Sequence, residues 1–367
     1  MPATIKGKLS KFFLKNNFQS KLFSYSNSDL NHKRNMNRQI ILKSRPKGMP
    51  TATNFELTEV PVPSMKEGEL LVKALYISVD PYMRSRMSDA KSYVPSFEVG
   101  KPMDGGVVAE VIESRHPDFV AGDAVLGHLQ WQEIQTINAQ QVTKLEKTVP
   151  LSYYLGILGM PGLTAYFGLN EIGKPVAGET IVVSGAAGAV GMVVCQIARI
   201  KGCRVVGIAG SDEKIAYLKD VLKVDEVINY HSEKNMKATI AHACPDGVDV
   251  YYDNVGGEIS DAVFSNINKF ARIILCGQIS LYNNTDIPVG PRPQPLMVKK
   301  SALMQGFIVS NYSARFGEGI QQLAQWLGEG KLSYQETIVE GFEKLPETFI
   351  GLFHGKNTGK LLIKTNS

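Results

Sequence analysis

Residues 179–191 read Glu179-Thr-Ile-Val-Val-Ser-Gly-Ala-Ala-Gly-Ala-Val-Gly191. The apolar run 181–183 enters a glycine-rich turn, and a segment with apolar residues at helical spacing, 192–201, follows that turn. A second apolar run, 204–209, comes at the interval that a strand–helix–strand unit requires. A glycine triplet alone also fits a surface turn, but with this second strand the pattern predicts a dinucleotide-binding fold.

Each of the three glycines has a role in such a unit. Gly185, Gly188 and Gly191 allow a tight turn, close approach of the backbone to a pyrophosphate and close packing of the helix on the sheet. The helix N-terminus would face the phosphates, whose negative charge its amide groups favour.

The residues after the second strand indicate which dinucleotide is bound. An NAD site usually places Asp or Glu about 20 residues after the glycines, where it binds the ribose 2′-hydroxyl. Here the strand-end position is Gly210, Ser211 is a natural N-cap for a helix beginning near Asp212, and Lys214 lies near that capped end. Lys214 also fits an ordinary solvated helix. Since no acid at Gly210 would repel a 2′-phosphate, the pattern favours NADPH.

Composition excludes several classes of partner. The chain has 367 residues, of which 44% are hydrophobic and 20% charged, as is ordinary for one large or two smaller globular domains. No run of about 18 apolar residues appears, so we expect no membrane partner. The formal charge is +5, but residues 1–35 hold seven basic residues and one acid, a net of +6, which leaves −1 for the remainder. We therefore expect no nucleic-acid partner.

The N-terminal extension, residues 1–35, is rich in Ser, Asn and Lys and almost free of acids. It resembles an organelle transit peptide in lacking acids, although it is poor in arginine. A disordered segment, or an over-extended start whose true beginning is Met36, fits equally well. The expected location is therefore cytoplasmic, or mitochondrial if residues 1–35 are a transit peptide.

The order of the expected elements predicts an α/β protein with two kinds of sheet. Short β-like runs broken by Pro and Gly fill residues 38–150, as in an antiparallel, barrel-like domain; they are 55–57, 70–77, 106–113 and 124–126. From residue 161 strands alternate with helices, which predicts a doubly wound parallel sheet with strands 181–183, 205–208, 226–228, 248–252 and 272–275. A helix at 319–329 and strands at 337–339 and 360–364 would let the chain rejoin the first domain. The predicted division is 1–36 (extension), 37–160 (barrel), 161–305 (nucleotide domain) and 306–367 (returning segment).

Several further segments, together with this domain order, resemble one family. They are Asp80-Pro-Tyr-Met-Arg-Ser-Arg-Met87, Gly159-Met-Pro-Gly-Leu-Thr-Ala-Tyr166, Asp253-Asn-Val-Gly-Gly257, Cys276-Gly-Gln-Ile-Ser-Leu-Tyr-Asn283 and Gly355-Lys-Asn-Thr-Gly-Lys360. Residues 37–365 resemble the medium-chain dehydrogenase/reductases, in the zinc-free branch of prostaglandin reductases and plant alkenal double-bond reductases. Arg45-Pro together with the run from Asp80 is most similar to the bacterial NADPH-dependent curcumin reductases. The resemblance implies a GroES-like barrel beside a Rossmann domain and, we expect, a homodimer.

The resemblance also implies a reaction. NADPH would reduce the C=C bond of an α,β-unsaturated aldehyde or ketone, an enal, an enone or a curcumin-type substrate, by hydride transfer to the β-carbon. Tyr282, with a ribose hydroxyl of the nicotinamide half, would hydrogen-bond the enolate. Tyr82 is a second candidate for contact with substrate, although either tyrosine could be a packing residue. A zinc-free lipid-alcohol dehydrogenase, a quinone reductase and a crystallin-like NADPH-binding protein without turnover remain alternatives.

The cofactor contacts implied by the resemblance come from eight places along the chain. They are Met160, Gly188, Ala189, Val190, Gly191, Ser211, Lys214, Tyr230, Asn254, Cys276, Gly277, Tyr282, Phe307, Ile308, Val309 and Asn357. Some also fit ordinary structural roles, since Asn254 suits a β-turn and Phe307 a strand core.

No metal is expected. A catalytic zinc needs three protein ligands and a structural zinc needs four. The four cysteines, at 195, 203, 244 and 276, all follow residue 190 and form no C-x-x-C pair, so they are interpreted as reduced core thiols of an intracellular protein. Zinc-dependent relatives carry Gly-His-Glu where this chain has Val99-Gly-Lys-Pro-Met103. His116 and His128 are interpreted as isolated surface or core histidines.

Overall fold

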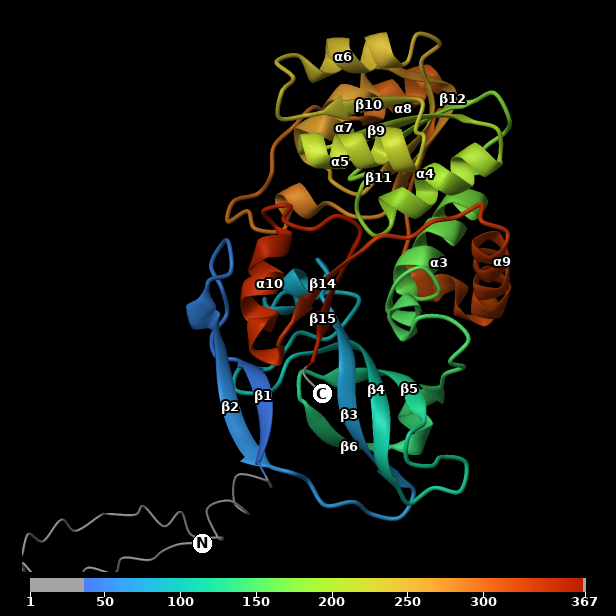
Figure 1. Ribbon diagram of the computed structural model, residues 1–367. Coiled ribbons are helices and arrows are strands. Elements are labelled where there is room, and N and C mark those ends of the chain that lie inside the picture. The colour runs from blue at the N-terminus through green and yellow to red at the C-terminus, as the bar shows by residue number, and fades with distance from the viewer. Residues whose placement is uncertain (1–35, 366–367) are drawn as a thin grey trace, which may run out of the picture. The chain divides into compact units, whose positions relative to one another are not determined.

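The computed structural model describes residues 36–365, which contain a parallel sheet covered by helices, a mainly antiparallel sheet and a separate two-stranded sheet (Figure 1). This confirms the predicted α/β fold class. The predictions for residues 1–35 lie outside the described residues. The division at 37–160, 161–305 and 306–367 stays a prediction.

The parallel sheet has the strand order β10-β9-β8-β11-β12-β13. Its strands are β8 Thr180–Ser184, β9 Arg204–Ala209, β10 Glu226–Asn229, β11 Val248–Asp253, β12 Ile267–Leu275 and β13 Leu303–Gly306. The chain runs outward from β8 to β9 and β10, then returns to β11 on the other side of β8. Five of these strands were predicted, and β13 was missed because it is a short edge strand of mostly exposed residues.

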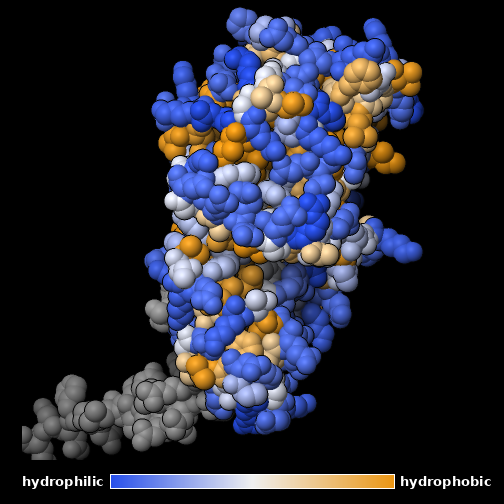
Figure 2. Space-filling view, turned by 90° about the vertical axis from the view of Figure 1, so that its right-hand side faces the viewer, coloured by the Kyte–Doolittle hydropathy of each residue, from blue (hydrophilic) through white to orange (hydrophobic). Residues whose placement is uncertain are grey.

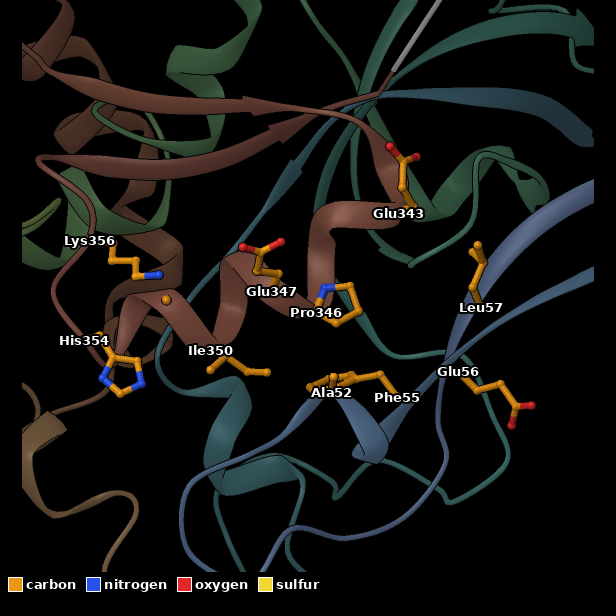
Figure 3. A pocket seen from close by; sticks show the side chains of 11 residues that line it. Ala52, Phe55, Glu56, Leu57, Glu343, Pro346, Glu347, Ile350, His354 and Lys356 are labelled. Atoms are coloured by element: carbon orange, nitrogen blue, oxygen red, sulfur yellow. The ribbon is translucent and has the colours of Figure 1, made fainter.

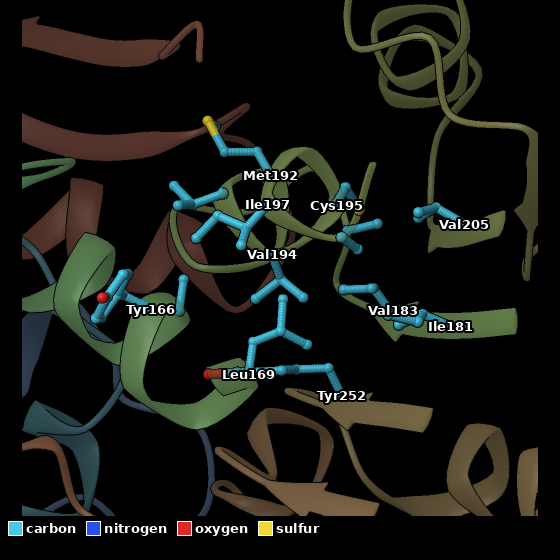
Figure 4. Close-up of a cluster of buried hydrophobic side chains, with 14 of the residues drawn as sticks. Tyr166, Leu169, Ile181, Val183, Met192, Val194, Cys195, Ile197, Val205 and Tyr252 are labelled. Carbon is cyan, nitrogen blue, oxygen red and sulfur yellow. The ribbon is translucent and has the colours of Figure 1, made fainter. Parts of the chain in front are cut away.

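The strands of this sheet are apolar throughout because both faces are covered. Side chains alternate between faces, so Ile181 and Val183 join one core cluster while Val182 joins the other. Figure 4 shows the first cluster, where Val194 and Ile197 lie between the sheet and Tyr166. Each such fully buried aliphatic side chain contributes about 1.5–3 kcal/mol. The helices are α3 Met160–Phe167, α4 Gly191–Ile200, α5 Asp212–Ala216, α6 Met236–Ala243, α7 Gly257–Phe264, α8 Gln294–Lys300 and α9 Phe316–Gly328.

The second sheet has the order β14-β15-β3-β4-β5-β7, with β6 also paired to β3. Its strands are β3 Glu69–Ser78, β4 Asp104–Ser114, β5 Ala124–Gln130, β6 Ile134–Asn138, β7 Val142–Lys144, β14 Glu336–Glu340 and β15 Lys360–Lys364. All its pairs are antiparallel except β14–β15. Since β15 pairs with β3, the C-terminal segment rejoins this sheet as predicted.

Two further strands and two helices complete this half. They are β1 Met36–Leu42, β2 Phe55–Pro61, α2 Met83–Arg86 and α10 Leu345–Leu352. Phe349 of α10 packs edge-to-face on Phe55 and on Trp131, with ring centroids 6.1 and 6.4 Å apart. This aromatic contact fixes α10, and therefore the loop that follows it, against the antiparallel sheet.

Three cysteines are core thiols as predicted. Cys195, Cys203 and Cys244 are buried, and burial raises the pKa of Cys195 to about 12 and that of the other two to about 11. The face in Figure 2 mixes hydrophilic and hydrophobic residues. Within residues 36–365 no helix combines the length and the apolar character needed to cross a bilayer.

Candidate active site

A cavity of about 920 Å³ lies where the parallel strands end at their carboxyl edge. Residues directly after the strands line it: Gly185 follows β8, Gly210 follows β9, Asn254 follows β11, Cys276 follows β12 and Phe307 follows β13. The opposite wall comes from the antiparallel sheet, through residues 79–82, Asp104, His128 and residues 360–361. Open α/β sheets bind ligands at this edge, beside the strand where the chain order reverses.

The glycine-rich turn between β8 and α4 requires its glycines. Gly185 has a φ of +59°, and a Cβ on Gly191 would lie 2.3 Å from the carbonyl oxygen of Gly185. The turn also holds the C-terminal segment, because the Gly359 amide donates to the Ala187 carbonyl at 2.8 Å. Residues 188–191 lead into α4 and line the cavity, so the N-terminus of α4 faces the cavity as an anion-binding end.

The end of β9 carries no acid. A Cβ on Gly210 would lie 2.6 Å from the Tyr230 hydroxyl, so the tyrosine packs directly on this glycine. Ser211 caps α5 by accepting a hydrogen bond from the Lys214 amide at 3.3 Å. The Lys214 ammonium donates to the Gly355 carbonyl at 2.8 Å, and burial lowers the pKa of Lys214. A cation and a tyrosine thus lie where a 2′-phosphate was predicted.

A buried carboxylate, Asp253, organises the loops after β11 and β12. It accepts hydrogen bonds from the hydroxyls of Ser184 and Tyr251 at 3.0 and 2.9 Å. It also accepts from the Gln278 amide side chain at 3.0 Å. Asn254 is fixed beside it by donating to the Ser184 carbonyl at 2.7 Å. The network therefore sets the backbone on which Cys276 to Tyr282 are placed.

Tyr282 follows the short helix Ile279–Leu281 and lines the cavity. Its hydroxyl accepts a hydrogen bond from the backbone amide of Gln278 at 3.3 Å. Burial raises the pKa of Tyr282, so its hydroxyl keeps its proton at neutral pH and is free to donate it in a hydrogen bond.

Cys276 is not a core thiol, which corrects the sequence interpretation. It is half-buried and lines the cavity directly after β12. Burial raises its pKa to about 12, so it is a neutral thiol rather than a reactive thiolate.

The facing wall contains Tyr82 and a buried ion pair. Burial and the nearby Asp80 both raise the pKa of Tyr82. The Lys360 ammonium, 1% exposed, donates to the Asp80 carboxylate, 8% exposed, at 2.6 Å. The Ser78 hydroxyl also donates to Asp80. The pair ties the end of β3 to the start of β15 and so fixes the loop that presents Tyr82.

A second polar cluster, made of Arg86, Asp104 and His128, lines the same wall. Both terminal nitrogens of the Arg86 guanidinium donate to the Asp104 carboxylate, and the distance from Nη2 to Oδ2 is 3.1 Å. On the other side, His128 Nε2 lies 2.5 Å from Asp104 Oδ1. The interpretation of His128 as isolated is therefore wrong. His116 remains apart from the cavity, 3.9 Å from Asp118.

A separate groove of about 450 Å³ lies between β2 and α10 (Figure 3). Phe55 and Leu57 line one side, and Pro346 and Ile350 line the other. Its acids Glu56 and Glu343 contact Lys43 and Arg38.

The structure brings the predicted site residues into one cavity, with the exception of Ser211, whose hydroxyl caps α5. Their roles stay predictions. Sequence reasoning missed Arg86, Asp104, His128, Lys360 and Asp253. Arg86 and Lys360 stand inside quoted motifs, but no local pattern links Asp104 with His128, since the register of β4 and β5 brings them together.

Comparisons with known proteins agree with this architecture. Residues 38–145 match the family described as the N-terminal domain of oxidoreductase, and residues 189–325 match the one described as zinc-binding dehydrogenase. The chain is 57% identical to YfmJ of Bacillus subtilis over 332 residues, 90% of this chain and 98% of that protein. It is 46% identical to the NADPH-dependent curcumin reductase of Escherichia coli, over 89% of this chain and 96% of that enzyme. The chain belongs to the medium-chain dehydrogenase/reductase family.

Within this family the chain lies in the branch of the prostaglandin, curcumin and alkenal reductases. Prostaglandin reductase 1 of Oryctolagus cuniculus is 44% identical over 87% of this chain and 90% of that enzyme. The crystal structure of CurA from Vibrio vulnificus in complex with NADPH is 45% identical and superposes with a TM-score of 0.86, over 90% of this chain and 99% of that one.

Many medium-chain dehydrogenase/reductases hold zinc, and the name of the second matched family refers to it. Among residues 36–365, no group of three or more His, Cys, Asp or Glu side chains is placed to hold a metal ion. The residues present do not form the ligand set that a catalytic zinc requires.

Proposed function

We propose that this protein is an NADPH-dependent reductase of carbon–carbon double bonds conjugated to an aldehyde or ketone. The observation that carries the proposal is the position of Tyr282, a protonated hydroxyl in the cavity that also contains the glycine-rich turn. The names of the relatives, which include a curcumin reductase, prostaglandin reductases and a 2-alkenal reductase, support the same class of reaction.

The residues that line the cavity suit the chemical groups of NADPH. The turn Gly188 to Gly191 would hold the pyrophosphate, because its glycines let the backbone approach a ligand closely and a Cβ on Gly191 would lie 2.3 Å from the Gly185 carbonyl oxygen. Lys214 and Tyr230 would hold the 2′-phosphate, and the absence of an acid at Gly210 removes the repulsion that an NAD-type site would impose. The remaining predicted residues on the cavity wall would hold the ribose and the nicotinamide: Met160, Asn254, Cys276, Gly277, residues 307–309 and Asn357.

The chain's own contribution to the reaction is electrostatic. When bound, NADPH supplies the hydride that a conjugated β-carbon accepts. Negative charge then develops on the carbonyl oxygen of the substrate, and the Tyr282 hydroxyl would donate a hydrogen bond to it. Because burial raises the pKa of Tyr282, the donor is present throughout the neutral pH range. Tyr82, on the opposite wall, would contact the bound substrate.

An assay of NADPH oxidation separates this proposal from its alternatives. The purified full-length protein is mixed with NADPH and an enone, a quinone, a lipid ketone or no acceptor. We expect oxidation with the enone and a product that has lost its C=C bond. Reduction of the quinone alone would contradict the proposal and indicate a quinone reductase, and reduction of the lipid ketone alone would indicate a lipid-alcohol dehydrogenase. Binding of NADPH without turnover of any acceptor would indicate a non-catalytic protein.

We further propose that two copies of the chain associate through the β13 edge. No strand of the described chain pairs with the outer side of β13. Large apolar side chains are exposed on β13 and on the helix that precedes it, namely Leu303 of β13 and Val298 of α8. A second copy of this edge would satisfy the free backbone groups and cover the apolar side chains. Sedimentation at a range of protein concentrations should show a dimer, and Val298→Lys should shift it toward the monomer.

A further inference from the structure

The cluster of Arg86, Asp104 and His128 is a rigidly built feature of the substrate-side wall. Arg86 is bidentate to Asp104, and its Nε donates to the Pro95 carbonyl at 2.8 Å. The guanidinium also lies 4.0 Å from the centre of the Phe97 ring. Arg86 therefore joins α2, β4 and residues 93–97, the segment that carries Tyr93 into the cavity.

The contact with Asp104 decides which nitrogen of His128 carries the proton. Burial alone would raise the pKa of Asp104, but hydrogen bonds from His128 and Arg86 outweigh it and lower that pKa, so Asp104 is a carboxylate. The Asp104 carboxylate, which only accepts hydrogen bonds, lies 2.5 Å from Nε2, nearer than the Arg86 guanidinium at 3.4 Å, so in the neutral imidazole the proton lies on Nε2. Nδ1 is then a bare hydrogen-bond acceptor.

This acceptor is available to a ligand. The His128 side chain is 56% exposed and lines the cavity that contains Tyr282. No donor within residues 36–365 bonds its Nδ1. The cluster thus presents one fixed acceptor on the wall away from the glycine-rich turn.

We propose that His128, held by Asp104 and Arg86, is a specificity-determining residue that binds a hydroxyl group at the far end of the substrate. The inference rests on the proposed function, because it takes the conjugated carbonyl to lie at Tyr282. The substrate class is therefore narrower than enones in general, namely enones or enals that carry an alcohol or phenol hydroxyl remote from the double bond.

The charges of the cluster favour a hydroxyl over a carboxylate. A carboxylate on the substrate would need guanidinium N–H groups that have no other partner. Those of Arg86 already donate to the Asp104 carboxylate and, from Nε, to the Pro95 carbonyl. The charges of Arg86 and Asp104 compensate each other. A hydroxyl group needs only a single hydrogen-bond partner, which Nδ1 provides.

The test uses pairs of enones that differ only at the far end of the chain. Straight-chain alk-3-en-2-ones of increasing length are assayed with and without a terminal hydroxyl, and the ratio of kcat/KM within each pair is recorded. The wild type should prefer the hydroxylated partner at one chain length by about 2- to 10-fold, the range of one neutral hydrogen bond. His128→Leu should bring that ratio to about one.

Two variants make the result specific. His128→Gln should keep most of the preference, because its amide NH2 can donate to Asp104 while its carbonyl accepts from the hydroxyl. His116→Leu, a matched change outside the cavity, should keep all of it. A ratio in His128→Leu equal to that of the wild type, or no preference at any length, overturns the proposal.

Failure of the proposed function would be visible separately. If neither member of any pair is reduced, calorimetric binding of the saturated terminal-hydroxyl ketones to the same variants tests the subsite without turnover. Affinity that falls in His128→Leu and persists in His128→Gln supports the subsite while the reductase proposal fails. Equal affinity in all variants overturns the subsite as well.

Discussion

Tyr282→Phe removes one hydroxyl from the cavity and keeps the ring that packs there. The hydroxyl makes one hydrogen bond with the described protein, accepted from the Gln278 backbone amide at 3.3 Å, so its loss disturbs the loop little. One preorganised donor to a developing oxyanion is typically worth about 10²- to 10³-fold in turnover, or about 3–4 kcal/mol. We expect about a tenfold loss, roughly 1.4 kcal/mol, because a ribose hydroxyl of the coenzyme can share this role.

The loss should fall on kcat, while the affinity for NADPH stays unchanged, because the interaction strengthens only as charge develops. Stopped-flow measurement of hydride transfer, with deuterated NADPH to verify that this step limits the rate, gives the relevant constant. Burial raises the pKa of Tyr282, so the donor form persists to higher pH than for a free tyrosine. The Tyr282-dependent part of the rate should therefore stay level from pH 7 to about 10, the ordinary tyrosine pKa. If hydride transfer in Tyr282→Phe is as fast as in the wild type and the isotope effect is full, Tyr282 has only a structural role. Tyr82 would then be the candidate donor to the enolate.

The coenzyme contact of Lys214, the buried pair Asp80–Lys360 and the expected independence from metal can each be tested. Lys214→Ala should raise the KM for NADPH about tenfold or more and scarcely affect NADH, since one charge-assisted contact is worth about 1.5–3 kcal/mol; equal effects on both coenzymes would contradict the 2′-phosphate assignment. Asp80→Asn and Lys360→Met should each lower the free energy of unfolding in urea by about 3–5 kcal/mol, because each leaves a buried charge unpaired, and the double variant should lose much less than the sum; additive losses would show that the pair is not coupled. Extended chelation should leave activity intact and elemental analysis should find no stoichiometric zinc, whereas activity lost on chelation and restored by zinc would reverse the prediction that no metal is needed.

The parts of the fold that could be predicted are those encoded by local pattern. Strands such as β8 are buried on both faces, so they appear in the sequence as continuous apolar runs. Gly185 and Gly191 mark their turn because backbone geometry excludes larger residues there. The edge strand β13 has no such pattern, because its residues are mostly exposed and it pairs on only one side.

The functional residues that were missed depend on contacts across the chain. Asp104 and His128 meet because β4 and β5 pair in one register, with Gly106 opposite His128, and a shift by one residue would turn His128 to the other face. Asp253 was quoted only as part of a motif, since its burial beneath two loops becomes visible only when β11 and β12 lie side by side. Long-range pairing, rather than residue type, decides these roles.

The C-terminal segment shows how such contacts complete the site. Three of its bonds reach different walls of the cavity: Gly359 to the glycine-rich turn, Gly355 to Lys214, and Lys360 to Asp80. Lys360 and Asp80 are 280 positions apart in the sequence, so neither could be assigned to the other in advance. Because one short stretch contacts both sheets, a change in it should alter coenzyme binding and substrate binding together. This is a physical reason why Gly355-Lys-Asn-Thr-Gly-Lys360 carries a recognisable motif although it contains no predicted catalytic residue.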